Sequence, residues 1–164
     1  RSDWWGLSER RSWALDPRPR IVSKYFGGTG GFALDLTADF IVVQGFAWFP
    51  KWPPGDIDVD PKDNAAVSEI LTAYAALMNS RSFSKLLEIF SPHVAGGQFD
   101  LSPRYVNAIP IPNLFLLAQD ERAGHAIRAL GQLARIPRVG QRDWDNAAER
   151  STAELYGGGL IEAI

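Results

Sequence analysis

The pattern of apolar and polar residues divides the chain into two parts. Before residue 60, aromatic and β-branched residues form short runs that glycine and proline separate, which is typical of strands joined by turns. This pattern predicts strands at residues 20–25, 31–36, 40–45 and 46–49. Pro50, Pro53 and Pro54 end the region, because proline cannot donate a hydrogen bond to a ladder.

After residue 63 the apolar period becomes helical. Val67, Ile70, Leu71, Tyr74, Leu77 and Met78 recur at the spacing of one helix face, with Asp63 and Asn64 as candidate caps. The same spacing over residues 83–90 predicts a second helix or a kinked continuation of the first, which ends at Ser91 and Pro92. Residues 93–101 are expected to be extended, and residues 102–108 to form one helical turn with Ser102 before it and Pro103 at the first helical position.

The last part of the chain predicts further helices. Residues 109–113 must be extended, because residues that precede proline avoid the α region. A third helix is expected at 114–135, and a last one that begins at Asp145 or Asn146 and ends near Tyr156. The expected fold is therefore α+β, with a β-rich part at 1–60 and a helical part of the same domain at 61–164.

Composition supports an ordinary globular domain. The chain has 164 residues, 46% of them hydrophobic, and no cysteine. The lack of cysteine excludes disulfides, thiolate zinc sites and thiol nucleophiles. No apolar run approaches the roughly 18 residues of a membrane span, so we expect a soluble, cytoplasmic protein without a membrane partner. Because Trp4 and Trp5 stand so close to Arg1, we also expect the chain to be a piece of a longer protein.

Charge is unevenly distributed along the chain. The net charge of −2 lacks the basic excess that is common in nucleic-acid-binding proteins. Residues 10–24, however, carry +4, residues 25–63 carry −4 and residues 81–138 carry +3. Folding either brings the two basic segments together into one basic face or leaves a mixed, solvated surface.

Several short patterns have both a functional and a structural interpretation. Gly27, Gly28, Gly30 and Gly31 form either a flexible turn or a loop that lets backbone approach a phosphate or base, although the lysine of a P-loop is missing. The aspartates at 56, 58 and 60 are spaced like the start of a calcium loop, but Pro61 stands where that loop needs glycine. The six tryptophans either pack in the core or offer stacking platforms, for which Trp48 and Trp52 are the best candidates.

The order of several segments is more specific than any single motif. Met78, Asn79 and Ser80 end the first predicted helix, Gly96 and Gly97 lead into an extended segment, and isoleucine alternates with proline at 109–112. Together with segments at 17–26, 32–35, 98–106 and 153–157, this order resembles the target-recognition region of adenine-specific DNA methyltransferases over about residues 13–157. More narrowly, it is similar to the C-terminal part of type IIG restriction-modification enzymes, with Met78 in place of the commoner leucine.

This resemblance implies a non-catalytic domain that holds double-stranded DNA and reads its bases while the target adenine is flipped out. The methyltransferase domain, with S-adenosylmethionine as its cofactor, would lie upstream of Arg1. No catalytic residue, metal ligand or cofactor is expected in this chain, because its only Pro-Pro pair follows Trp52 and not the asparagine or aspartate of the family's catalytic motif. The candidate DNA-binding residues are Arg18, Arg20, Lys24, Tyr25, Gly28, Gly30, Arg81, Gln98 and Arg104.

Two alternatives belong to other classes of protein. The first is a protein-interaction or scaffold domain, in which the basic residues only solvate the surface. The second is an enzyme that acts on carbohydrate, suggested by the tryptophans and aspartates alone. Duplex binding that weakens with salt distinguishes DNA recognition from the first alternative, because phosphate contacts release counterions.

Overall fold

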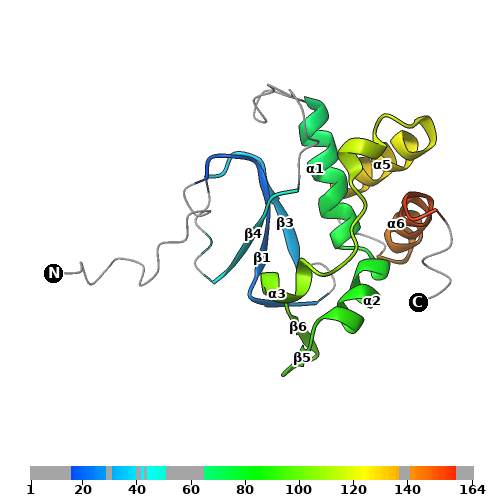
Figure 1. Ribbon diagram of the computed structural model, residues 1–164. Coiled ribbons are helices and arrows are strands. Elements are labelled where there is room, and N and C mark those ends of the chain that lie inside the picture. The colour runs from blue at the N-terminus through cyan, green and yellow to red at the C-terminus, as the bar shows by residue number, and fades with distance from the viewer. Residues whose placement is uncertain are drawn as a thin grey trace.

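Two small antiparallel sheets and a group of helices make up the fold. The computed structural model describes residues 16–28, 31–39, 42, 44–50, 65–136 and 141–157. The strands lie mainly in the N-terminal half and the helices mainly in the C-terminal part, which confirms the α+β prediction (Figure 1). Among these residues, no helix is long and apolar enough to cross a membrane.

The main sheet has the strand order β3-β1-β4. It consists of β1 (Arg20–Lys24), β3 (Phe32–Asp35) and β4 (Gly45–Trp48), all antiparallel to their neighbours. The register places Ile21 between Leu34 and Trp48, and these side chains pack in the core. The indole Nε1 of Trp48 donates to Ser23 Oγ at 3.0 Å, so this tryptophan packs in the core and is not a stacking platform.

The small sheet has the order β2-β6-β5. Its strands are β2 (Phe26–Gly27), β5 (His93–Val94) and β6 (Gln98–Asp100), so it joins the N-terminal region to a hairpin from the second half of the chain. Gly96 and Gly97 form the hairpin turn with φ values of +81° and +71°, a conformation that favours glycine. The extended structure predicted for 93–101 is thus confirmed, as a hairpin.

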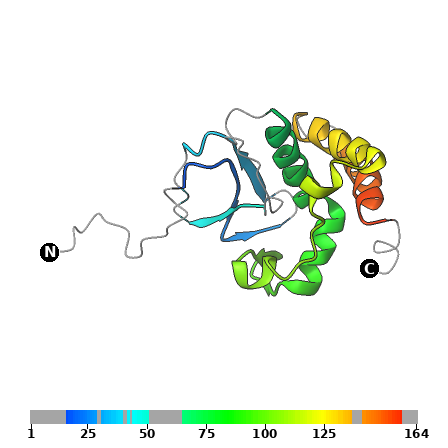
Figure 2. The same ribbon diagram turned by 45° about the horizontal axis from the view of Figure 1, so that its top comes forward.

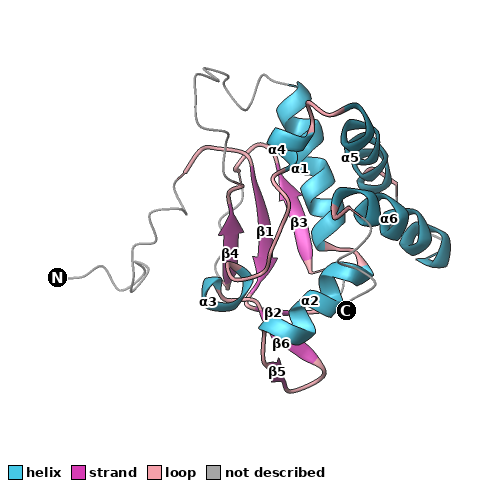
Figure 3. Cartoon of the chain, turned by 45° about the vertical axis from the view of Figure 1, so that its right-hand side comes forward, coloured by secondary structure: helices cyan, strands magenta, loops and turns pink. Residues whose placement is uncertain are grey.

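The helices cover one side of the main sheet. α1 (Ala65–Met78) lies against β1 and β3, and α5 (Glu121–Ala134) and α6 (Gln141–Leu155) lie beyond it, on the side away from the sheet (Figures 1 and 2). α2 (Arg81–Phe90) follows α1 after a short turn, and the short helices α3 (Pro103–Val106) and α4 (Leu114–Leu117) complete the set (Figure 3). No helix lies on the opposite face of the main sheet in the part of the chain that the structure describes.

The helix predicted from the apolar face between Val67 and Met78 and the helix predicted over residues 83–90 are confirmed as α1 and α2, and two other helix predictions need correction. The single helix predicted at 114–135 is divided into α4 and α5, because Asp120 Oδ1 accepts from the Ala123 N–H at 2.8 Å and caps a new helix. The last helix begins at Gln141, before the predicted cap residues 145 and 146. Its first turn is held by Trp144, which is buried and donates from Nε1 to the Leu133 carbonyl at 2.9 Å.

Some sequence predictions concern residues outside the described part of the chain. The candidate cap residues Asp63 and Asn64 belong to this group, as do the three spaced aspartates and Trp52. The strand predicted at 40–45 also lies partly outside, and the described residues Val42 and Gln44 precede β4 without joining it.

Candidate functional site

An open pocket lies where the chain passes from the main sheet to the small sheet. It has a volume of about 510 Å³, and we call it the inter-sheet pocket. Its described lining residues are Val22, Ser23, Lys24, Phe26, Gly27, Gly28, Gly31, Phe32, Ala33, Val42, Gln44 and Gln98. The pocket therefore combines the end of β1, the glycine loop, the residue before β4 and the start of β6.

Three exposed polar side chains line this pocket. Lys24 is the last residue of β1 and is paired with Gly45 of β4. Gln44 is the residue before Gly45, so it lies near Lys24. Gln98 begins β6 immediately after the hairpin glycines. No carboxylate is among the described lining residues. The pocket therefore contains one cation and two amide groups. Each amide can both donate and accept hydrogen bonds.

The glycine loop, of which Gly27, Gly28 and Gly31 are described, also lines the pocket. The Gly31 N–H donates to the Gly28 carbonyl at 3.1 Å and closes a tight turn. A Cβ at Gly27 would lie 2.9 Å from Leu101 Cδ1, whereas a Cβ at Gly28 would meet nothing within 4 Å. Gly27 is thus held by close packing, while the space beside Gly28 is open. Gly30 lies outside the described residues.

Two aromatic side chains are exposed at the junction of the sheets. Tyr25 is 39% exposed and Phe26 is 42% exposed, and their rings meet edge to face at 4.8 Å between centroids. Phe26 lines the inter-sheet pocket, and Tyr25, at the bend between β1 and β2, also packs against Phe46 with 5.0 Å between the ring centroids.

Arg20 does not have the position that the prediction of DNA contact requires. Its Nε lies 3.0 Å from Asp35 Oδ2, and both side chains are only 1% exposed. The pairing of β1 with β3 places these two residues opposite each other, which explains the contact. Arg20 is a buried structural residue in this fold, and we withdraw it as a DNA ligand.

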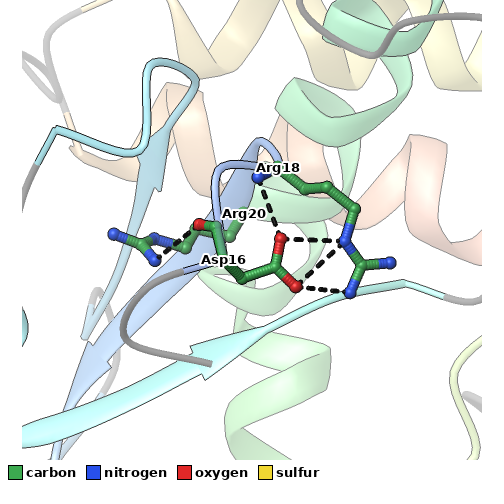
Figure 4. A network of polar contacts seen from close by, with 3 residues as sticks. All are labelled: Asp16, Arg18 and Arg20. Carbon is green, nitrogen blue, oxygen red and sulfur yellow. Dashed lines mark hydrogen bonds and ion pairs between the residues drawn. The ribbon is translucent and has the colours of Figure 1, made fainter. Parts of the chain in front are cut away.

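Arg18 is 46% exposed and lies in a separate place from Lys24. It binds Asp16 with both Nε and Nη2, at 3.0 and 2.6 Å (Figure 4). Its guanidinium also lies over the Phe49 ring, 4.8 Å from the ring centroid. The hydrogen bond with Arg18 lowers the pKa of the Asp16 carboxyl and raises the pKa of the guanidinium. Arg18 precedes β1 and Lys24 is the last residue of that strand, so the length of β1 separates the two basic residues.

The two other predicted arginines also lie outside the inter-sheet pocket. Arg81 is exposed in the first turn of α2, and Arg104 is exposed on α3 with its guanidinium 5.4 Å from the Tyr105 ring centre. The N-terminus of α2 is already occupied, since Ser80 Oγ accepts from the Phe83 N–H and Glu149 Oε1 accepts from the Ser82 N–H, both at 3.1 Å. The structure thus brings together Lys24, Gly28 and Gln98 and keeps the arginines apart.

Among the lining residues that sequence reasoning did not select as DNA-binding, Phe26 and Gln44 have exposed side chains that bear on function. Phe26 stands in an aromatic pair beside the glycine loop, and that adjacency was a usable signal. Gln44 carries no such signal, because only the pairing of β4 with β1 brings residue 44 near residue 24.

A second pocket of about 450 Å³ lies between the main sheet, α1 and α3. Its described lining is mostly apolar, with Tyr74, Asn107 and Asn113 as its polar side chains. The Tyr74 hydroxyl already bonds to backbone at Pro112 and Leu114, and Asn113 Oδ1 caps α4. Two of these three groups therefore support the fold, which leaves the inter-sheet pocket as the better candidate site.

Within the described residues, no group of three histidines or acidic side chains is arranged to hold a metal ion. Comparison with known proteins gave no match, whether to a protein-family model, to a curated protein or to a solved structure. The geometry of the inter-sheet pocket therefore carries the functional argument.

Proposed function

We propose that this chain is a non-catalytic DNA target-recognition domain that holds duplex DNA and reads its sequence. The observation that supports the proposal most directly is the content of the inter-sheet pocket. Lys24, Gln44 and Gln98 are all exposed there, beside the exposed ring of Phe26 and without a described carboxylate. This combination suits a ligand that has both anionic groups and hydrogen-bonding base edges.

Each part of the pocket matches one need of DNA recognition. A lysine binds backbone phosphate as a point charge, which fixes the position of a protein on the duplex. Amide side chains form paired hydrogen bonds with base edges in the major groove. That groove is about 12 Å wide and admits a two-stranded ribbon. The β5–β6 hairpin projects from the body of the molecule (Figures 1 and 3), and its residue Gln98 lines the pocket.

The proposal places this domain in an adenine-specific DNA methyltransferase or restriction-modification enzyme of type IIG. A methyltransferase domain elsewhere in a longer protein would bind S-adenosylmethionine and carry out the reaction. Of the segments that resemble the family, Asn79 and Ser80 lie between α1 and α2, and residues 98–100 form β6. The role of this domain would be to hold the duplex while the partner domain acts on an extruded base.

Duplex binding by the chain tests this proposal. We expect fluorescence anisotropy to show binding to a labelled duplex that weakens as salt rises. Lys24→Ala is expected to weaken binding and to reduce the slope of log affinity against log salt by about one. Lys85→Ala is the matched control, because Lys85 is exposed on α2 and does not line the pocket.

Two outcomes would contradict the proposal. One is a chain that is folded by circular dichroism and binds no duplex even at low salt, which would favour the protein-interaction alternative. The other is an equal loss of affinity in Lys24→Ala and Lys85→Ala, which would mean that the inter-sheet pocket is not the binding surface.

A further inference from the structure

We infer that Gln44 and Gln98 each read an A·T base pair at the inter-sheet pocket. This inference rests on the proposed function and specifies what the same site recognises. It follows from where the two amides are held, from the hydrogen-bonding pattern they offer and from the apolar ring beside them.

One amide lies on a strand and the other directly before one. Gln98 is paired with Val94 within the β5–β6 hairpin. Gln44 directly precedes Gly45, the first residue of β4, which is paired with Lys24. Both side chains are exposed and line the same pocket, so both are free to meet a ligand there.

The amide group favours adenine over guanine for a simple reason. A carboxamide presents one donor and one acceptor side by side. The major-groove edge of adenine presents the complementary pair, an N6 donor and an N7 acceptor, whereas guanine presents two acceptors. Guanine would place its O6 against the amide oxygen. Arginine, which suits guanine, does not occur among the described residues that line the pocket.

Phe26 supplies an apolar surface next to Gln98. The register pairs Phe26 with Asp100, and Gln98 is two residues before Asp100, so Phe26 and Gln98 lie on the same face of the small sheet. An exposed apolar ring in this position suits contact with the C5-methyl group of thymine, the partner of adenine. Lys24 remains available for a neighbouring phosphate.

Replacing each glutamine with glutamate tests whether the amides read adenine. A carboxylate has only acceptors, so glutamate favours the N4 amine of cytosine over adenine. We would equilibrate the 164-residue chain with a randomised duplex pool and sequence the bound fraction. The unchanged chain is expected to enrich A·T at two positions. Gln44→Glu and Gln98→Glu are each expected to reduce the A·T enrichment at one of these positions about tenfold and to raise cytosine there.

Gln132→Glu is the matched control, because Gln132 is exposed on α5 and does not line the pocket. Gln98→Ala adds a second comparison, in which adenine enrichment falls without a gain of cytosine. Enrichment that is unchanged in both pocket variants, or changed equally by Gln132→Glu, would overturn the inference while leaving salt-dependent DNA binding in place. A chain that binds no member of the pool at low salt would overturn both the inference and the proposed function.

Discussion

The side-chain amide of Asn79 binds both backbone polar groups of Phe32. Nδ2 donates to the Phe32 carbonyl at 2.8 Å, and Oδ1 accepts from the Phe32 N–H at 3.1 Å. Nδ2 also donates to the Ala75 carbonyl at 2.8 Å. Since β3 is an edge strand of the main sheet, Asn79 takes the place of a neighbouring strand at that edge and joins it to the end of α1.

We therefore expect Asn79→Ala to destabilise the fold strongly. The change removes these three hydrogen bonds and leaves the polar groups of Phe32 without this partner. The free energy of unfolding should fall by about 2 to 4 kcal/mol in urea denaturation. Asn107→Ala, at an exposed asparagine that ends α3, is the matched control and should cost less than about 1 kcal/mol. Equal costs for the two variants would contradict the role of Asn79.

The buried pair of Arg20 and Asp35 predicts a stability effect and no direct loss of a DNA contact. Arg20→Ala leaves the Asp35 carboxylate buried without its cation, a change that commonly costs about 3 to 5 kcal/mol. Arg18→Ala removes an exposed pair and should cost no more than about 1 kcal/mol. Thermal unfolding measures both effects. A fully stable Arg20→Ala variant with weakened duplex binding would instead restore Arg20 as a DNA ligand.

Alkaline pH is expected to destabilise the protein through two tyrosines. The Tyr74 hydroxyl donates to the Pro112 carbonyl at 3.1 Å and accepts from the Leu114 N–H at 2.8 Å, and Tyr156 donates to the Pro110 carbonyl at 2.8 Å. Burial raises the pKa of each hydroxyl to about 12, from an ordinary value of 10.0. The unfolded chain therefore loses these protons first, and the free energy of unfolding should decrease between pH 10 and pH 12.

Urea denaturation at pH 8, 10 and 11 with Tyr74→Phe as the comparison measures this effect. The phenylalanine variant should be less stable at pH 8, because it loses two hydrogen bonds, and should lose less stability as the pH rises. A two-unit difference in pKa corresponds to about 2.7 kcal/mol at most for the buried Tyr74 hydroxyl. An identical pH dependence in the variant would show that Tyr74 does not contribute.

Gly45 provides a test of how the pocket is built. A Cβ at this residue would lie 2.0 Å from the Ser23 carbonyl oxygen, which belongs to the neighbouring strand and cannot move freely. Gly45→Ala is expected to cost about 3 kcal/mol or more of unfolding free energy. Gly28→Ala, where the added carbon meets nothing within 4 Å, should leave stability nearly unchanged. Comparable melting temperatures for the two variants would contradict this difference in packing.

Local signals in the sequence predicted much of the fold. The apolar period of α1 and α2, and the proline that begins α3, are properties of neighbouring residues and needed no tertiary information. Contacts between distant residues explain the failures. The start of α6 depends on the contact of Trp144 with α5, and the burial of Arg20 depends on an aspartate 15 positions away.

The candidate site shows the same limit. Lys24, Gly28 and Gln98 were chosen from the sequence individually, but their meeting in one pocket depends on the pairing of β2 with β6. That pairing joins residues more than 70 positions apart, and no local pattern contains it.

The exposure of Gln44 and Gln98 has a consequence for the evolution of this protein. The groups that hold the sheets in place, such as the Asn79 amide and the pair of Arg20 with Asp35, make their contacts in other parts of the structure. Positions 44 and 98 can therefore accept other side chains without a cost to the core. On the proposed function, mutation at these two positions would give descendants of this chain new DNA targets on an unchanged scaffold.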